Sequence, residues 1–381
     1  MISPGLDVIH SLLRRAIVGL PRRSFSTALL FSLLLPVSAF AEQVSGTDSL
    51  REPAQILDSR MPAPVIGIAR AGKALVSVGP RGLIQRSEDG GKSWRQVPSP
   101  VSSDLVQVRF SDALNGWVVG HDSVLLHTAD GGASWKVQLD GRSVLALLQD
   151  QYGRRANAGD QVADDMLREI NLAMSTSATP DVLAAPFLDV LFDDNGNGFV
   201  VGAFGMILHS RDAGTTWEPW VDRTSNERRM HLYGLAEREG VFYVSGEQGL
   251  LMRLDSQTQR FVTLETPYTG TYFGVRSFDG LLLVYGLRGN LFVSRDNALH
   301  WQKIETGLKS SIVDVVEQGG ELLVVSQGGQ MVSLNQHNLG ITSLQPAEIG
   351  EIYAASYSGE AGMLVVTQFS GAKLVDITSA E

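Results

Sequence analysis

Four copies of a short turn signature constrain this chain more than any other feature. Each copy has a Ser or Thr, an Asp two positions later, a turn containing Gly or Ala, and a Trp at its end. The copies are Ser87–Trp94, Thr128–Trp135, Ser210–Trp217 and Ser294–Trp301. Their tryptophans are separated by 41, 82 and 84 residues, which is one period followed by two doubled ones. A fixed period of about 40 residues in strand-rich sequence indicates a β-propeller.

The residue types of the signature serve the turn itself. An Asp side chain can accept hydrogen bonds from backbone N–H groups further round the turn, and a Trp opening the next strand covers it with a large apolar face. We therefore expect structural roles for the four aspartates and four tryptophans: Asp89, Trp94, Asp130, Trp135, Asp212, Trp217, Asp296 and Trp301.

A second, weaker pattern lies upstream of each signature, where a short break, in most units a glycine, separates two predicted strands. The spacing of these breaks sets the number of repeat units. The equivalent residues are Gly79, Gly120, Gly202, Gly246, Gly286, Gln327 and Gln368, at steps of 41, 82, 44, 40, 41 and 41 residues. The steps define seven units, with one unit's length of extra sequence between the second and the third. The sequence thus predicts an all-β, seven-bladed propeller with Asp-box turns and one insertion.

The strands can be placed in the second unit and at the end of the chain. In the second unit they are expected at Leu105–Phe110, Gly116–Gly120, Val124–Thr128 and Trp135–Leu139. The seventh unit begins near Ile352 but lacks sequence for an outermost strand. Because a circular array of sheets must avoid open edges, we expect an N-terminal strand at Ala54–Ser59 to close the last blade.

Residues 1–41 have the pattern of a cleaved signal peptide. Arg22 and Arg23 precede the apolar run at 28–37, and Ala39-Phe40-Ala41 is a small-x-small cleavage site. The run is too short to span a membrane, and the mature chain, 42–381, has no later candidate. We expect a periplasmic product; general secretory and twin-arginine export both remain open.

Charge and cysteine usage exclude some partners. The formal net charge is −10, and it becomes −13 without residues 1–41. A chain this acidic is a poor nucleic-acid binder. There are no cysteines, so no disulfide stabilises the exported protein.

The insertion, about 142–186, differs in character from the repeats. Val162, Met166, Ile170 and Met174 recur every four positions and predict a helix over 163–174, and a shorter helix is expected over 144–152. A connection of this kind leaves a propeller on the face opposite the signatures. Two interpretations stay open: a lid whose apolar residues form local core, and a partner-docking element.

A cationic loop and an aromatic segment follow on the same side. Arg and aromatic residues together make good binding anchors, although ordinary solvated loop charges explain the pattern equally well. The candidate binding residues are Arg223, Arg228, Arg229, His231, Tyr268 and Tyr272.

Residue patterns for catalysis are mostly missing. Asp-box turns also occur in sialidases, but no set of three convergent arginines with a Tyr–Glu pair can be placed here. The run beginning at Asp193 imitates a calcium loop, yet its twelfth position is Phe204 where a bidentate Glu is required. His127 and His209 occupy equivalent repeat positions and form no zinc motif. We expect no catalytic residue, metal ion or cofactor.

With these motifs in place, the chain resembles the photosystem II stability/assembly factor-like propellers of the BNR or Asp-box repeat proteins. The resemblance rests on the run Val78-Gly79-Pro80-Arg81-Gly82 leading to Trp94 and on Val201–Gly205 leading to Trp217. It implies a non-enzymatic chaperone that holds a membrane protein during assembly.

The chain departs from the photosynthetic members through its helical insertion and several eroded signatures, and it also resembles the proteobacterial, non-photosynthetic subgroup. That resemblance implies a periplasmic accessory of a membrane complex, such as an RND-type (MMPL) transporter. The alternatives are a sialidase-like propeller that binds or hydrolyses glycans, and a purely structural envelope protein.

Overall fold

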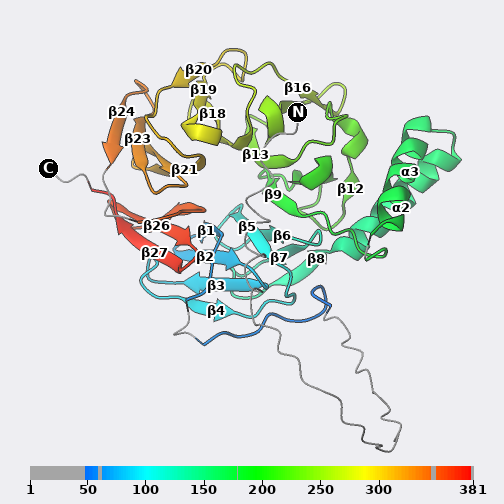
Figure 1. The fold of residues 1–381 in the computed structure, drawn as a ribbon, viewed down its shortest axis with the longest axis horizontal. Coiled ribbons are helices and arrows are strands. Elements are labelled where there is room, and N and C mark those ends of the chain that lie inside the picture. The colour runs from blue at the N-terminus through cyan, green and yellow to red at the C-terminus, as the bar shows by residue number, and fades with distance from the viewer. Residues whose placement is uncertain (1–47, 59–61, 178, 345–348, 379–381) are drawn as a thin grey trace, which may run out of the picture. The chain divides into compact units, whose positions relative to one another are not determined.

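Seven antiparallel sheets form a ring around a central channel in the computed structural model, which describes residues 48–58, 62–177, 179–344 and 349–378 (Figure 1). Six sheets have four strands and the last has three among the described residues. The predicted seven-bladed propeller is confirmed. The predicted signal peptide lies outside the described residues.

Consecutive strands pair within each blade, with the first innermost. Blades one to three contain β1 Gly67–Ala71, β2 Ala74–Gly79, β3 Leu83–Ser87, β4 Arg95–Val97; β5 Leu105–Phe110, β6 Gly116–Gly120, β7 Leu125–Thr128, β8 Lys136–Leu139; β9 Phe187–Phe192, β10 Gly198–Gly202, β11 Ile207–Ser210 and β12 Glu218–Pro219. The 3-10 turns η1 Ala203–Gly205 and η2 Val221–Arg223 flank β11 and β12.

Blades four to seven repeat the same order. They contain β13 Leu232–Arg238, β14 Val241–Gly246, η3 Glu247–Gly249, β15 Leu251–Asp255, β16 Arg260–Thr263; β17 Tyr272–Phe278, β18 Leu281–Gly286, η4 Leu287–Gly289, β19 Leu291–Ser294, β20 Gln302–Ile304; β21 Ile312–Gln318, β22 Glu321–Ser326, β23 Met331–Asn335, β24 Ile341–Leu344; β25 Ala355–Tyr357, β26 Met363–Gln368 and β27 Gly371–Asp376.

The signature turns are held by their own aspartates. In the first copy Asp89 Oδ2 accepts the Ser93 hydroxyl (2.6 Å), and Asp89 Oδ1 accepts both the Ser93 amide (2.9 Å) and the Ser87 hydroxyl (2.8 Å). These hydrogen bonds from Ser93 and Ser87 lower the pKa of Asp89 to about 2. The other three copies repeat the pattern around Asp130, Asp212 and Asp296.

Each signature also joins its blade to the preceding one. A Cβ on Gly91 would lie 2.6 Å from a methyl of Val365 in the seventh blade. One on Gly132 would lie 2.7 Å from Val76 in the first blade. Trp135 is buried beside this contact, 6.2 Å from the Phe110 ring. At Gly91 and Gly132 a side chain would clash with the neighbouring blade, and glycine adopts the left-handed backbone there without steric cost.

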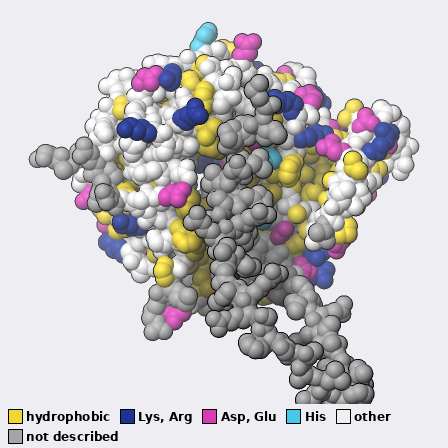
Figure 2. Space-filling model, in the orientation of Figure 1, with side chains coloured by type: hydrophobic (Ala, Val, Ile, Leu, Met, Phe, Trp, Pro, Cys, Tyr) yellow, Lys and Arg dark blue, Asp and Glu magenta, His cyan; other side chains and the backbone are white. Residues whose placement is uncertain are grey.

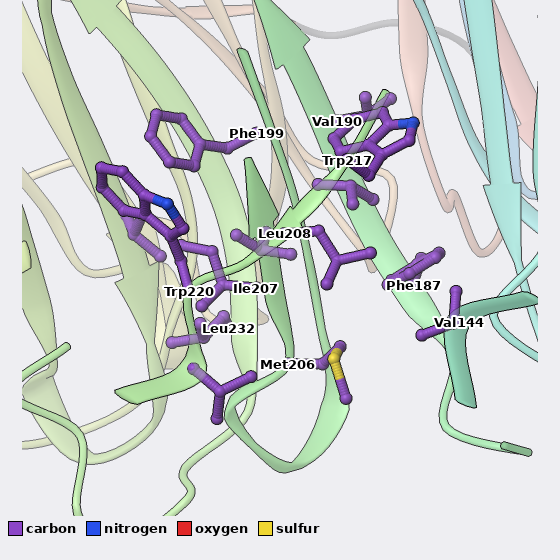
Figure 3. Close-up of a cluster of buried hydrophobic side chains, with 14 of the residues drawn as sticks. Val144, Phe187, Val190, Phe199, Met206, Ile207, Leu208, Trp217, Trp220 and Leu232 are labelled. Atoms are coloured by element: carbon purple, nitrogen blue, oxygen red, sulfur yellow. The ribbon is translucent and has the colours of Figure 1, made fainter. Parts of the chain in front are cut away.

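The insertion forms two helices, α2 Gly141–Asn157 and α3 Gln161–Ser175, whose apolar faces join the core of blade three. Asp140 caps α2 by accepting the amides of Arg142 (3.0 Å) and Ser143 (2.8 Å). Figure 3 shows Val144 of α2 beside Phe187 in this cluster. The interpretation of the helices as local core therefore has direct structural support.

Two details of the insertion differ from the sequence prediction. Val162 was predicted on the apolar stripe but is 54% exposed, because Ala163, one residue later, faces the core instead. The helices were expected to cover one face of the ring. They contact β12 and η2 and lie outside the ring beside the outer strands, because their apolar stripes pack on the edge of blade three (Figure 1).

The prediction that Ala54–Ser59 is a strand that closes the last blade is wrong for the part of it that the structure describes. Its backbone lies along β4 of the first blade, where Leu57 donates to the Gln96 side chain (2.8 Å) and Gln96 donates to the Gln55 carbonyl (2.8 Å). These bonds hold the segment at blade one, outside any strand. The ring is closed by inner contacts, including Val65 N–H to the Gln368 carbonyl (3.2 Å).

The described part of the chain has no helix that meets the length and hydropathy of a membrane span.

Candidate functional site

One face of the ring carries the turns between second and third strands together with the connections between blades; we call it the connection face. The amide of Ala203 in such a turn donates to the Pro186 carbonyl in the connection that enters the blade (3.0 Å). Leu287 makes the same bond to Thr271 (3.2 Å). The signature turns emerge at the opposite ends of the strands, on what we call the signature face.

In four blades the turn of the connection face has the sequence Gly-x-x-Gly, and a side chain at its second glycine would clash with the next connection. A Cβ on Gly82 would lie 2.0 Å from the Val101 carbonyl oxygen. One on Gly289 would lie 2.3 Å from that of Leu308. The glycines let each turn rest against the next connection, so the residue just before them projects outward.

In four blades this projecting residue is bulky and has a left-handed backbone conformation. The backbone φ values are 57°, 57°, 53° and 57° for Arg81, Phe204, Gln248 and Arg288, and all four residues are exposed. Such a conformation costs a non-glycine residue about 1–2 kcal/mol. Sequence reasoning missed these residues, although the second variable position of the Gly-x-x-Gly run was the signal that marks them.

Arg228 is the sequence-predicted candidate best placed on this face. It is exposed and borders a hollow of about 220 Å³, whose lining includes Asn226, Met230 and Gln248. The hollow therefore joins the cationic loop to the turn of blade four. A guanidinium and an amide side chain here offer several hydrogen-bond donors to an extended chain.

Arg223 and Arg229 have internal partners. The Arg223 guanidinium lies 4.8 Å above the Trp220 ring and pairs with Glu218 (2.8 Å). Arg229 pairs with Glu169 of α3 (2.9 Å) and so ties the loop to the insertion. The expected proximity of loop and insertion is thus present and occupies Arg229, while Arg223 is occupied by its neighbours Glu218 and Trp220.

His231 and Tyr268 are half-buried on the connection face. The His231 ring accepts the Phe204 amide at Nδ1 (2.9 Å), and its centroid lies 5.0 Å from that of the Phe204 ring. Tyr268 lies against Phe292, with centroids 5.9 Å apart. Tyr272 is fully buried between blades four and five, which corrects its assignment as a surface anchor.

The structure brings no sialidase-like arginine cluster together among the described residues. On the inner strands β5 and β17, Arg109 pairs with Asp189 (2.6 Å) and Arg276 with Asp314 (3.3 Å). The calcium-like run is a hairpin turn, in which Asp193 accepts the amides of Asn195 and Asn197 (both 2.9 Å). No group of metal-ligating residues occurs in the described ranges.

Charge on the molecular surface is mixed. Figure 2 shows positive and negative side chains interspersed over the face it presents, without a broad field of one sign. The face in view therefore has no extended field of one sign that would attract a charged partner over a long range.

These features define a class: a seven-bladed propeller whose Asp-box turns join neighbouring sheets and whose opposite face presents strained, exposed side chains. The chain belongs to the family described as "Photosynthesis system II assembly factor YCF48", whose model matches residues 69–146 and 178–349, more than half of the chain. The residues left between the two matched stretches fall almost entirely in α2 and α3. The helical pair is therefore this chain's departure from the family.

Related sequences support this family, and a solved structure has the same fold. The chain is 25% identical over 251 residues to "Photosystem II assembly lipoprotein Ycf48" of Synechococcus, spanning 60% of this chain and 72% of that protein. It is 34% identical over 278 residues to "Photosystem II stability/assembly factor HCF136, chloroplastic" of Arabidopsis thaliana, spanning 65% and 59%. A solved structure described as "YCF48 bound to D1 peptide" shares the fold, with a TM-score of 0.56 at 15% identity over 86% of this chain and 97% of that one.

Proposed function

We propose that this protein binds an extended segment of a membrane-protein complex through its connection face and helps that complex to assemble or operate. It acts as a binding protein and not as an enzyme. The names of the relatives describe assembly factors, and one solved relative is described as bound to a D1 peptide. These names support a protein partner for this chain.

The observation that carries the proposal is the set of bulky side chains held in left-handed turns. Glycine would adopt these backbone angles at no steric cost, so Phe204 and Arg288 keep a strain that folding does not require. Strained residues of this kind cluster at ligand-binding sites, where the side chain itself is needed. Arg228 and Gln248 extend the surface across blade four.

Site-specific photocrosslinking in living cells tests the proposal. A photoreactive phenylalanine analogue replaces Phe204, which is 62% exposed on the connection face. The matched control places the same analogue at Leu299, which is 71% exposed on the signature face. We expect a crosslink to an integral membrane protein from position 204 and none from 299. Equal yields from both positions, or no membrane protein from 204, would contradict the proposal.

Deleting the insertion is a poorer test, because α2 and α3 contribute Leu148, Tyr152 and Ile170 to the core of blade three. A deletion would expose that core as well as remove a surface. The informative variants are the exposed ones, Phe204→Ser and Arg288→Glu, for which folding is checked by thermal unfolding.

We place this activity in the bacterial periplasm and propose a component of an RND-type transporter as the partner. The signal-peptide pattern of residues 1–41 supports export, and the resemblance to transporter-associated propellers supports the partner class. Cleavage after Ala41, read by mass spectrometry of the mature protein, tests export. Co-purification with a transporter from detergent extracts tests the partner; its absence would remove the transporter and leave the binding role open to the crosslinking test.

A further inference from the structure

A polar cavity of about 100 Å³ lies inside the central channel, next to its mouth on the connection face. The mouth is formed by residues at the start of the inner strands. Six of them line the cavity and are half-buried: Ile66, Val106, Tyr233, Phe273, Val313 and Tyr353. In four of these blades a β-bulge skips that residue in the strand register and turns it toward the channel.

The acidic groups of the cavity are already bonded. Asp189 accepts Arg109 Nε (2.8 Å) and Arg109 Nη2 (2.6 Å), and it also accepts the backbone amides of Val190 (3.0 Å) and Leu235 (2.8 Å). Four donors satisfy both of its oxygens. This carboxylate therefore has little capacity left for a cationic ligand.

Asp314 is bonded in the same way in blade six. It accepts the backbone amides of Val315 (2.9 Å) and Ala355 (3.2 Å) and one contact from Arg276 (3.3 Å). The two aspartates thus join neighbouring inner strands, and their charges are balanced by the two channel arginines.

The hydrogen-bond donors that line the cavity, by contrast, still have free capacity. Arg276 makes only that single contact, and its Nε and Nη1 have no hydrogen-bond partner among the described residues. Gln107 accepts the Val108 amide through Oε1 (3.0 Å), which fixes the orientation of its amide and leaves both Nε2 hydrogens unpaired within the described ranges. The Tyr285 hydroxyl also lines the cavity, and burial raises its pKa to about 12, so it stays a neutral O–H donor.

Two glycines make room beside these donors. Gly234 and Gly274 occupy the inner-strand position that holds Asp in blades three and six. A Cβ on Gly274 would lie 2.4 Å from the Tyr285 ring, so the ring can lie here only because the side chain is absent. The cavity is therefore a space left between a phenol, a primary amide and a guanidinium that contacts Asp314 through one nitrogen only.

We propose that this cavity binds a carboxylate, held by the Arg276 guanidinium, the Gln107 amide and the Tyr285 hydroxyl. Donor groups with free N–H or O–H positions, next to carboxylates that already accept three or four hydrogen bonds, favour an anion, and a planar guanidinium suits the two oxygens of a carboxylate. The volume admits a carboxylate with one or two carbons, or the terminal carboxylate of an extended chain entering through the mouth. The inference is independent of the proposed function.

Thermal unfolding of the full mature protein with sodium acetate tests the site, because a ligand of the native state raises Tm with its concentration. Sodium chloride at equal ionic strength and acetamide, an uncharged analogue of similar shape, are the reference solutes. We expect a saturable rise in Tm with acetate only. An equal rise with chloride or acetamide, or no saturable rise with acetate, would overturn the proposal.

Gln107→Glu tests the site most directly, since it keeps the Oε1 acceptor and replaces only the donating amide NH2 group with a carboxylate oxygen. Blades three and six already hold Asp at this position, so the fold accommodates a carboxylate there. We expect more than a tenfold loss of acetate affinity, whereas Gln302→Glu, the same change on exposed β20, keeps the wild-type value. Unchanged acetate affinity in folded Gln107→Glu would refute the site.

A second pair of variants keeps the test independent of charge. Tyr285→Phe removes the channel hydroxyl and should weaken acetate binding severalfold, while Tyr243→Phe removes a buried hydroxyl outside the cavity lining and should not. Identical affinities in both variants would count against the assigned donors.

N-acetyl-trialanine and its C-terminal amide identify the source of the carboxylate. Binding of the free acid but not the amide supports a chain terminus as the ligand. Binding of acetate without either peptide supports a small free carboxylate.

Discussion

The two faces of this propeller use the same left-handed backbone in opposite ways. On the signature face the side chains turn inward: Asp130 accepts the Ser134 amide (2.9 Å) and hydroxyl (2.6 Å), and Gly132 approaches the neighbouring blade. On the connection face Phe204 and Arg288 project into solvent from equally left-handed positions. The difference teaches that the signature face holds the ring together, while the connection face is free for recognition.

The largest expected effect is on the signature face. Trp135→Ala should reduce the free energy of unfolding by about 3–5 kcal/mol, because it removes a buried aromatic residue and leaves a cavity at the contact of blades one and two. Leu299→Ala, an exposed position on the same face, should change it by less than about 0.5 kcal/mol. Urea unfolding of both variants measures the difference. Similar losses would show that the tryptophans are not the elements that join the blades.

The free energy of unfolding should fall in acid because of His209 in blade three. Burial lowers the pKa of His209 to about 4, and its Nε2 lies 2.6 Å from the Asn197 Oδ1. Because the pKa is about 6.5 in the unfolded chain, stability is full above that pH and is lost as pH falls toward 4, by about 3 kcal/mol in total.

Urea unfolding at pH 7 and pH 4.5 measures this loss. His209→Phe should flatten the pH dependence, since a neutral ring then stacks on Phe199. His127, the equivalent residue of blade two, is half-buried, and His127→Phe should alter the pH profile less. An unchanged profile in His209→Phe would remove His209 as the cause.

A smaller loss is expected from a signature aspartate. Asp130→Ala removes the acceptor for the Ser134 and Ala133 amides (both 2.9 Å) and should cost about 1–2 kcal/mol, as loss of a helix cap does. Asp130→Asn keeps one acceptor oxygen and should cost less. Equal effects of the two substitutions would mean that the turn does not depend on the carboxylate.

The smallest change in stability is expected at Phe204, together with the clearest contrast between stability and partner recovery. Phe204→Gly relieves the left-handed strain while making the unfolded chain more flexible, so the free energy of unfolding should change by less than about 1 kcal/mol. Partner recovery in the crosslinking or co-purification assay should nevertheless fall severalfold. A variant that loses stability but keeps its partner would reverse the division between the two faces.

The periodic signatures were enough to predict seven blades, because each Asp and Trp reports a local turn repeated at a fixed interval. Strands of the second blade were placed within one residue of β5–β8. The candidate site was predicted less well. Arg228 reaches the surface as expected, whereas Arg223 and Arg229 pair with Glu218 and Glu169. The sequence does not show that Arg229 meets Glu169, which lies 60 positions away, or that Arg223 folds back onto Glu218 and Trp220.

The sequence by itself determined the number of blades, their strand order and the turns that join them, since hydrogen bonds within eight-residue turns and period-two strands are local properties. Only the tertiary structure decided where Ala54–Leu57 lies, which side of α3 is buried, and that Gln107, Arg276 and Tyr285 meet in one cavity. Those outcomes depend on which blades become neighbours when the ring closes. Contacts such as that of Leu57 with Gln96, 39 positions away, leave no periodic mark in the chain.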